Sequence, residues 1–263
     1  MEKLYPTDMS TEQWELIESL LPPKNTFGRP RSTDLRLVLN AIFYIVVAGC
    51  PWSMLPRDFP PYKTVYHYFR AWRLDGHWEK IHYQFVQWER VAQGREPAPS
   101  AASLDSQSVK IAILTDHAIG YDGGKKIKGR KRHLLVDTLG LVMMVVVTAA
   151  NVSDQKGARL IFERITVIPE RLRRLTLIWV DGTYEGVDFA NWVKGLYFWV
   201  LQTIKRSDDA KGFTLLPKRW VVERTWGWLN WYRRLAKDYE ILPETSETFI
   251  YVAIISLMLL RLA

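Results

Sequence analysis

The stretch RHLLVDTLGLVMMVVVTA, residues 132–149, decides the fold class of this chain. Two apolar runs rich in Val and Leu flank Asp137-Thr138-Leu139-Gly140, and the glycine can supply the backbone angles that a tight turn needs. The pattern predicts a β-hairpin with strands at 132–137 and 141–149. Further apolar runs predict strands at 104–111, 175–180 and 199–205.

Apolar residues at helical spacing follow and separate these strands. They predict helices at about 153–164, 186–194, 218–237 and 248–261. Strands mixed with helices in this order favour the α/β class, in which a mixed sheet is flanked by helices.

The first 92 residues predict helices alone. Ser10 can cap a helix that ends at Pro22-Pro23, and further helices are predicted at about 33–47, after Pro60-Pro61 and from near Asp75. The third of these four carries basic and aromatic residues opposite its apolar side, namely Lys63, Tyr66, His67, Arg70 and Arg73. This all-α pattern is typical of a helix-turn-helix-like DNA-binding domain. An ordinary helical cap on the larger domain is the alternative, and the near-neutral charge of this part leaves both open.

A segment rich in Pro, Ala and Ser, QGREPAPSAAS at residues 93–103, separates the two parts. It lacks apolar periodicity, as linkers do. We therefore expect a helical domain at 1–92, a linker at 93–102 and an α/β domain at 103–263.

Basic residues are concentrated in the second part. The chain has 263 residues with 36 Lys and Arg against 28 Asp and Glu, a net charge of +8, and residues 97–263 hold 24 of the basic residues against 17 acidic ones. The run KKIKGRKR contains six basic residues: Lys125, Lys126, Lys128, Arg130, Lys131 and Arg132. Because Lys and Arg displace the counterions condensed on nucleic acid, the run predicts a phosphate-binding strip. A solvated surface is the alternative.

Several classes of protein are excluded or disfavoured. The single cysteine, Cys50, excludes an internal disulfide framework and a cysteine-based zinc cage. No HExxH, GxSxG or GxxxxGK[ST] motif is present. The N-terminus lacks the pattern of a secretion signal, and the apolar tract 249–260 is too short to span a bilayer, so we expect a cytoplasmic protein without a membrane partner.

Two aspartates occupy positions at which a shared site could form. Asp105 lies within the first predicted strand of the sheet, where a buried carboxylate is costly unless it is paired, hydrogen-bonded or bound to metal. Asp181 ends the fourth strand, and Gly182 allows a sharp exit that leaves the carboxylate at the carboxyl edge, where open α/β sheets bind ligands. If the two strands are neighbours, both aspartates face the same place.

Helical geometry adds a third acid, Glu223. At about 100° per residue, the helix predicted at 218–237 aligns Glu223, Asn230, Arg234 and Lys237 on one face, opposite an apolar face that packs on the sheet. Taken singly, the three acids have ordinary interpretations, as a strand ion pair, a turn residue and a helix-surface ion pair. Asp137 and Asp154 are better explained as a hairpin residue and a helix-start residue.

Three acids without a neighbouring Cys or His pair favour a hard cation with oxygen ligands, magnesium or its substitute manganese. Two such ions about 3.5–4 Å apart can activate an attacking water or hydroxyl and stabilise the departing oxygen at one phosphorus.

Long motifs in the chain closely resemble the DDE transposases of bacterial insertion sequences, specifically the insertion-sequence-five family. The helical region at 5–23 and 28–69 also looks like the N-terminal domain of this family. The matching motifs of the second part are DSQSVK (105–110), GYDGGKKIKGRKRHLLVDTLGL (120–141), VDGTYEG (180–186), KRSDDAKGF (205–213) and KRWVVERTWGWLNWYRRLAKDYE (218–240).

The resemblance implies an RNase H-like catalytic domain at 103–263, with Asp105, Asp181 and Glu223 as catalytic metal ligands. It also implies DNA contacts from the basic strip together with Arg224, Arg233, Arg234 and Lys237, and from Lys63, Arg70 and Arg73 in the helical domain. The Y-x2-R-x3-E-x6-K pattern of neighbouring families is not met as written: Arg219 and Trp220 stand upstream where Arg and Tyr are sought, and Asn230 stands seven residues after Glu223.

We therefore expect a bacterial, nucleoid-associated transposase. It would bind the terminal inverted repeats of its element as a synaptic homodimer, cleave phosphodiester bonds, and join the freed 3′-hydroxyl to double-stranded target DNA. One alternative is a metal-dependent nuclease that cuts without strand joining. The other is a catalytically silent DNA-binding protein derived from such an element, against which the three intact acids argue.

Overall fold

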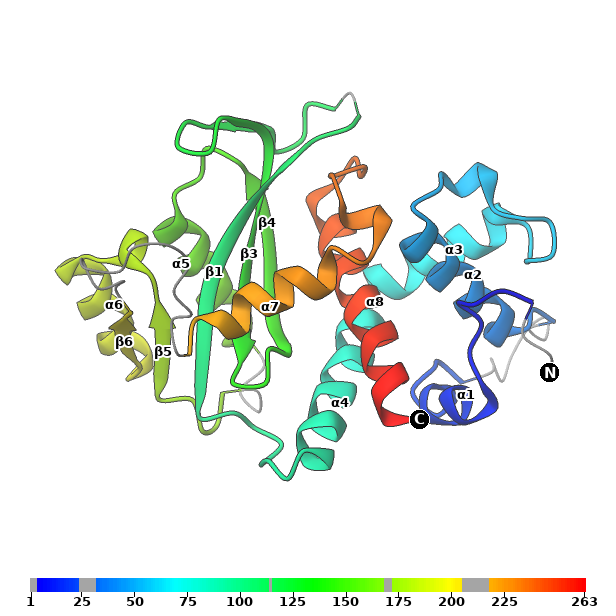
Figure 1. Cartoon of the computed structure of the whole chain (residues 1–263), viewed down its shortest axis with the longest axis horizontal. Coiled ribbons are helices and arrows are strands. Elements are labelled where there is room, and N and C mark those ends of the chain that lie inside the picture. The colour runs from blue at the N-terminus through cyan, green and yellow to red at the C-terminus, as the bar shows by residue number, and fades with distance from the viewer. Residues whose placement is uncertain (1–3, 24–31, 114, 168–171, 205–217) are drawn as a thin grey trace.

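The computed structural model describes residues 4–23, 32–113, 115–167, 172–204 and 218–263. Within these ranges the strands form one six-stranded sheet with helices on both of its faces, and the N-terminal helices lie beyond the sheet on one side (Figure 1). The strands are β1 Ala101–Lys110, β2 Gly120–Asp122, β3 Ile127–Asp137, β4 Val142–Ala149, β5 Leu177–Val180 and β6 Val200–Thr203. The motif KRSDDAKGF lies entirely outside the described residues.

The sheet is mixed, as the sequence predicts. Its order is β2-β3-β1-β5-β6, with β4 also paired to β3. Strand β3 runs antiparallel to β1, β2 and β4, whereas β1, β5 and β6 are mutually parallel. Strand β2 was not predicted because it has three residues, two of them polar or glycine, and no apolar alternation.

The predicted β3–β4 hairpin is confirmed. Gly140 has a φ of 78°, in the left-handed region that favours glycine. The carboxylate of Asp137 accepts the backbone N–H groups of Leu139 and Leu141 at 2.9 and 2.8 Å. It also forms a buried ion pair with Arg90. Asp137 is therefore the hairpin residue that the sequence predicts.

The helices largely follow the predicted positions, and the Ser10 capping box is present at the start of the first. They are α1 Thr11–Glu18, α2 Leu35–Ala48, α3 Tyr62–Leu74, α4 His77–Ala92, α5 Asp154–Ile165, α6 Val187–Tyr197, α7 Trp220–Leu229 and α8 Pro243–Leu262. Short 3-10 turns occur at η1 Trp52–Met54, η3 Gly182–Tyr184 and η4 Arg233–Leu235.

Helix α7 is much shorter than the predicted helix at 218–237, and that prediction is wrong. The helix ends at Leu229, and Arg234 lies beyond it in the buried turn η4. There the Arg234 guanidinium pairs with Glu240 at 2.7 Å and donates to the carbonyl of Cys50 at 3.1 Å. These tertiary contacts override local helix propensity, so Arg234 and Lys237 do not share a helical face with Glu223.

Two apolar cores lie on the two faces of the sheet. Leu134 and Val136 of β3 point into the core that also holds α7, α8 and the N-terminal helices, whereas Leu135 points into the core under α5 and α6. Residues 93–100 connect α4 to β1, but α8 packs against both α4 and β4. The N-terminal helices therefore share a core with the C-terminal helix.

Helix α8 is longer than predicted. By length and composition its 20 residues could cross a membrane, and it is the one helix of that kind among the described residues. However, 72% of its most apolar window is buried inside the molecule. The helix is therefore explained as the central core helix of the helical assembly.

Glu247 connects α8 to the sheet. Its carboxylate accepts the N–H of Val147 on β4 at 2.8 Å and pairs with Arg164 of α5 at 2.7 Å. Burial raises the pKa of Glu247 from 4.5 to about 7, while the charge of Arg164 opposes this rise.

Because the pKa of Glu247 is higher in the folded than in the unfolded state, the folded state binds more protons between about pH 4.5 and 7. Stability should therefore fall as pH rises through this window, by at most about 1.4 kcal/mol per pH unit from this group. We predict that Glu247→Gln removes this part of the slope in urea unfolding measured from pH 4.5 to 7.5. Glu163→Gln, at an exposed position on α5, should keep it. Equal slopes for wild type and Glu247→Gln would contradict this assignment.

Candidate active site

The two aspartates lie at the same edge of the sheet. Strands β1 and β5 are parallel neighbours, and their pairing ends with Ser103 opposite Trp179. Two residues further along each strand are Asp105 and Asp181, so the register that pairs the strands carries both to equivalent positions on one face. Adjacent strands are about 4.8 Å apart. The sequence left open whether these two strands are neighbours, and the structure shows that they are.

Asp105 is enclosed by the elements around it. Its Oδ2 accepts the indole N–H of Trp226, a residue of α7, at 3.1 Å. Burial raises the pKa of Asp105 from 3.8 to about 6, and the charge of Asp181 adds to the rise, while hydrogen bonds from Ser106 and Trp226 oppose it. Asp105 thus resists ionisation beside a second carboxylate. A bound cation would stabilise the ionised forms of both groups.

Asp181 sits where β5 turns into η3. Its Oδ1 accepts both the N–H of Thr183, at 2.8 Å, and the Thr183 hydroxyl. Its Oδ2 lies 3.7 Å from the guanidinium of Arg219, the residue that precedes α7. A Cβ at Gly182 would meet no atom within 4 Å, in keeping with an open exit from the strand.

Glu223 is exposed on α7 between the two side chains that reach the aspartates. At about 100° per residue, Arg219 and Trp226 lie about 40° and 60° to the same side of Glu223 on the helix. Because those two contact Asp181 and Asp105 respectively, the face of α7 next to Glu223 is the one that covers the aspartates. The glutamate lies at the rim of that face.

Across the described ranges, no three Asp, Glu, His or Cys side chains are gathered closely enough to hold one metal ion. The chemistry of the donors nevertheless fits a hard cation at Asp105 and Asp181, since two adjacent carboxylates, one with a raised pKa, supply oxygen ligands at one strand edge. Glu223 is not part of a closed ligand set in this conformation.

Tyr184 is a residue of this site that the sequence reasoning missed. Its hydroxyl is buried. Burial raises the pKa of Tyr184 well above its usual range, and the charges of Asp105, Asp154 and Asp181 add to the rise. The available signal was its position three residues after Asp181, in VDGTYEG.

The predicted basic strip is not one surface. Side chains of a strand alternate between its faces, so a basic run on β3 cannot present every residue to DNA. Arg130 and Arg132 point under the segment that follows α7, and both are buried. Arg130 pairs with Asp238 at 3.0 Å, and Arg132 donates to the carbonyl of Leu235 at 2.8 Å. Both arginines are committed to internal partners, which disfavours the expected DNA contact, and that contact stays a prediction.

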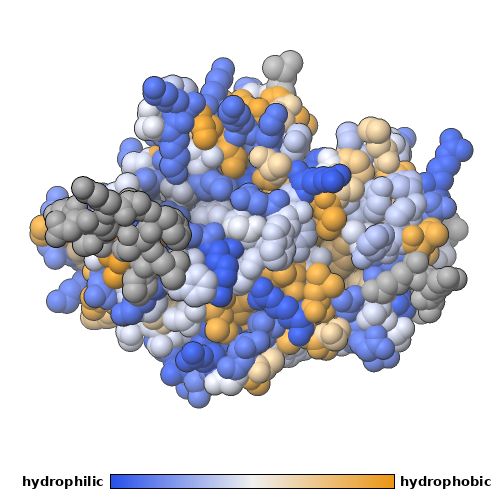
Figure 2. All heavy atoms as spheres, in the orientation of Figure 1, coloured by the Kyte–Doolittle hydropathy of each residue, from blue (hydrophilic) through white to orange (hydrophobic). Residues whose placement is uncertain are grey.

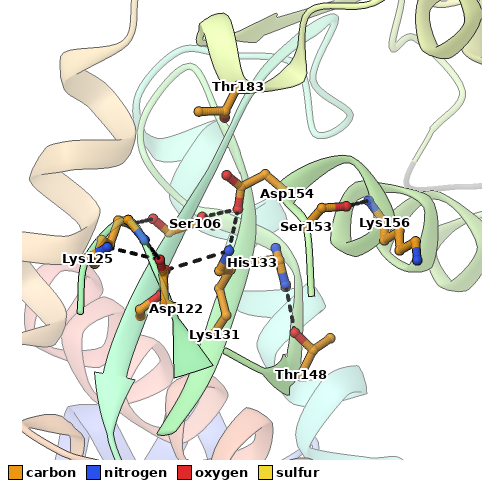
Figure 3. Close-up of polar contacts among 12 residues, drawn as sticks. Ser106, Asp122, Lys125, Lys131, His133, Thr148, Ser153, Asp154, Lys156 and Thr183 are labelled. Carbon is orange, nitrogen blue, oxygen red and sulfur yellow. Dashed lines mark hydrogen bonds and ion pairs between the residues drawn. The ribbon is translucent and has the colours of Figure 1, made fainter. Parts of the chain in front are cut away.

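Lys131 points to the opposite face and is also buried. Figure 3 shows its ammonium group between two carboxylates, 3.2 Å from Asp154 and 3.8 Å from Asp122. Asp154 also accepts the hydroxyl of Ser106 at 2.7 Å, which fastens the start of α5 to β1. Lys131 is therefore held between internal carboxylates, and its expected DNA contact stays a prediction.

The remaining basic residues of the prediction divide by exposure. Those exposed to solvent are Lys63, Arg70, Lys125, Lys126, Lys128, Arg233 and Lys237, and Arg73 is half-buried. Figure 2 shows hydrophilic side chains, interspersed with apolar ones, over the end of the sheet at the top of the view. Arg224 is half-buried between Trp220 and Trp228, with its guanidinium 4.3 and 4.7 Å from the ring centroids. Arg234 is buried, which disfavours its expected DNA contact, and that contact stays a prediction.

A mixed sheet of this strand order with helices on both faces is the architecture expected of an RNase H-like domain. A family model described as "Transposase DDE domain" matches residues 96–259, and one described as "Putative transposase of IS4/5 family" matches residues 9–82. The chain therefore belongs to the DDE transposases of the IS4/5 type, and the predicted fold class is confirmed.

One curated relative comes from Burkholderia cepacia and bears the name "Putative transposase for insertion sequence element IS402". It is 28% identical to this chain over 126 residues, which cover 46% of this chain and 59% of the relative. The match thus spans less than two thirds of that relative.

The buried arginines generate a stability prediction. We expect Arg130→Met to lower the free energy of unfolding by about 3–5 kcal/mol, because it strips Asp238 of a buried cation. Lys128→Met also replaces a basic residue of β3 by Met, but at an exposed position two residues away. There we expect the free energy of unfolding to change by no more than about 0.5 kcal/mol. Urea unfolding measures both. An Arg130→Met protein that unfolds like wild type but binds DNA weakly would return Arg130 to the DNA surface.

Proposed function

We propose that this transposase binds the terminal inverted repeats of its element, cleaves phosphodiester bonds and transfers the freed 3′-hydroxyl ends to target DNA. The observation that carries the proposal is the docking of α7 over the strand edge. Arg219 and Trp226 contact Asp181 and Asp105, and Glu223 lies between them along the same helix. This arrangement supports a DDE triad whose three acids come from elements that are packed together.

Each side chain has a distinct part in the proposed chemistry. Asp105 and Asp181 hold divalent magnesium, which manganese can replace, and Glu223 completes the ligand set when its side chain turns toward the strand edge. When bound, the ions supply activation of the attacking oxygen and stabilisation of the leaving oxygen at phosphorus. Arg219 and Thr183 keep the Asp181 carboxylate in place.

The exposed cations suggest where DNA lies. Lys125, Lys126 and Lys128 surround the β2–β3 turn, while Arg233 and Lys237 follow α7. We propose that these residues neutralise phosphates near the cleavage site. Lys63 and Arg70 on the outer face of α3 make contacts further along the repeat. The division into a DNA-binding domain at 1–92, a linker at 93–102 and a catalytic domain at 103–263 is part of this proposal, as are a synaptic homodimer and a cytoplasmic, nucleoid-associated location.

The acid assignment makes a direct prediction. We expect Asp181→Ala to abolish cleavage of a repeat-end duplex in magnesium, by a factor on the order of 10³ or more, as seen for essential catalytic groups. Asp188→Ala is a matched control, because Asp188 is exposed at the start of α6, seven residues later. Cleavage is followed on denaturing gels. Cutting that survives Asp181→Ala would remove this residue from the metal site.

Strand joining separates the proposal from its rivals. A pre-cut repeat end supplied with plasmid target should yield joined product. Cleavage without joined product would favour the nuclease. The absence of both cleavage and joining would favour the silent DNA-binding protein.

The exposed lysines around the β2–β3 turn predict how DNA binding depends on salt. We expect the combined change of Lys125, Lys126 and Lys128 to Gln to reduce the slope of log affinity against log salt by about 0.9 for each phosphate that is no longer neutralised. Lys194→Gln, exposed on α6, should leave the slope unchanged. Fluorescence anisotropy across a range of NaCl concentrations measures it. An unaltered slope in the triple variant would place the DNA elsewhere.

A further inference from the structure

The buried indole of Trp226 donates its hydrogen bond to a carboxylate of the candidate metal site. The side chain is 7% exposed and belongs to the apolar core between α7 and the sheet. Buried indole N–H groups generally find a hydrogen-bond acceptor. Here the acceptor is Asp105 Oδ2, at 3.1 Å, rather than a backbone carbonyl.

Core packing alone does not account for this hydrogen bond. A phenylalanine ring would fill much of the same apolar space without an N–H group. The hydrogen bond instead joins a core residue of the helix to a carboxylate of the candidate metal site. Its effect on Asp105 is electrostatic as well as geometric, since the indole donor acts against the rise in the Asp105 pKa that burial causes.

The hydrogen bond has two geometric consequences. It fixes the orientation of the Asp105 carboxylate, and hydrogen-bonded carboxylates are better preorganised as metal ligands. It also fixes the axial position of α7 on β1. Glu223 lies three residues before Trp226, about 4.5 Å along the helix axis, so the same bond sets where the glutamate stands relative to the aspartates.

We propose that Trp226 is a positioning residue for divalent-metal binding, acting through Asp105 and through the placement of Glu223. This inference rests on the proposed function, because it presumes that Asp105 is a metal ligand.

Trp228 provides a matched control on the same helix. It is half-buried, and its ring stacks with the guanidinium groups of Arg224 and Arg261, at 4.7 and 4.3 Å from the ring centroid. Replacing it by Phe removes an indole from α7 without removing the donor to Asp105.

The test compares Mn²⁺ binding by the full chain in three forms, wild type, Trp226→Phe and Trp228→Phe, using isothermal titration calorimetry. We expect Trp226→Phe to weaken Mn²⁺ binding about tenfold, the lower end of the effect of losing a hydrogen bond to a metal ligand. Trp228→Phe should bind Mn²⁺ as wild type does. Cleavage by Trp226→Phe should recover as Mn²⁺ is raised about tenfold, which a defect of folding would not allow.

A second measurement covers the case in which Trp226→Phe does not fold. In wild type, the assigned ¹⁵N–¹H indole resonance of Trp226 should shift as Mg²⁺ is added and saturate with binding, while that of Trp228 should not. An indole resonance of Trp226 that ignores bound Mg²⁺ overturns the proposal.

The outcomes for this inference and for the proposed function are distinguishable. If wild type and Trp226→Phe bind Mn²⁺ with equal affinity, the role of Trp226 is overturned but the metal site is not. Wild type that binds no Mn²⁺ overturns the metal site itself, and the role of Trp226 with it.

Discussion

The parallel pairing of β1 with β5 is the constraint on which the site depends. The register of the two strands, Ala101 to Leu177 through Ser103 to Trp179, determines which residues leave the paired region together. Two residues beyond its end, Asp105 and Asp181 stand at equivalent positions on neighbouring strands. A one-residue slip would turn one of them to the opposite face of the sheet, where α5 and α6 pack. Both the acids and the helix that covers them therefore depend on this pairing.

Buried charge holds the covering elements in place. Arg130 binds the segment after α7 through Asp238, and Arg90 binds α4 to the β3–β4 hairpin through Asp137. Such pairs stabilise little in net terms, because desolvation offsets the attraction, but breaking one is costly. They make the attachment of the helices to the sheet specific, and α7 is thereby confined to one position over the strand edge. Basic residues that look like DNA contacts in the sequence are in part the cations of this framework.

The sequence predicts the strands of the hairpin and the Ser10 cap, because these follow from local alternation, glycine placement and capping chemistry. It fails where tertiary contacts decide. The helix predicted to 237 ends at Leu229 because Arg234 is drawn into contacts with Glu240 and Cys50. The run at 125–132 could not reveal that its residues alternate between the faces of β3. Tyr184 lies within VDGTYEG, but nothing in that motif marks its side chain as buried beside the aspartates. The roles of the three acids stay predictions.

The central claim is that Asp105, Asp181 and Glu223 jointly hold a hard divalent ion above this strand edge. The most direct measurement is anomalous scattering from a crystal of the protein soaked in Mn²⁺. We expect a peak about 2.0–2.3 Å from carboxylate oxygens of Asp105 and Asp181, the range typical of hard divalent ions, with the Glu223 side chain turned toward it. A crystal whose manganese lies away from both aspartates, or that leaves this edge empty at saturating Mn²⁺, would contradict the claim.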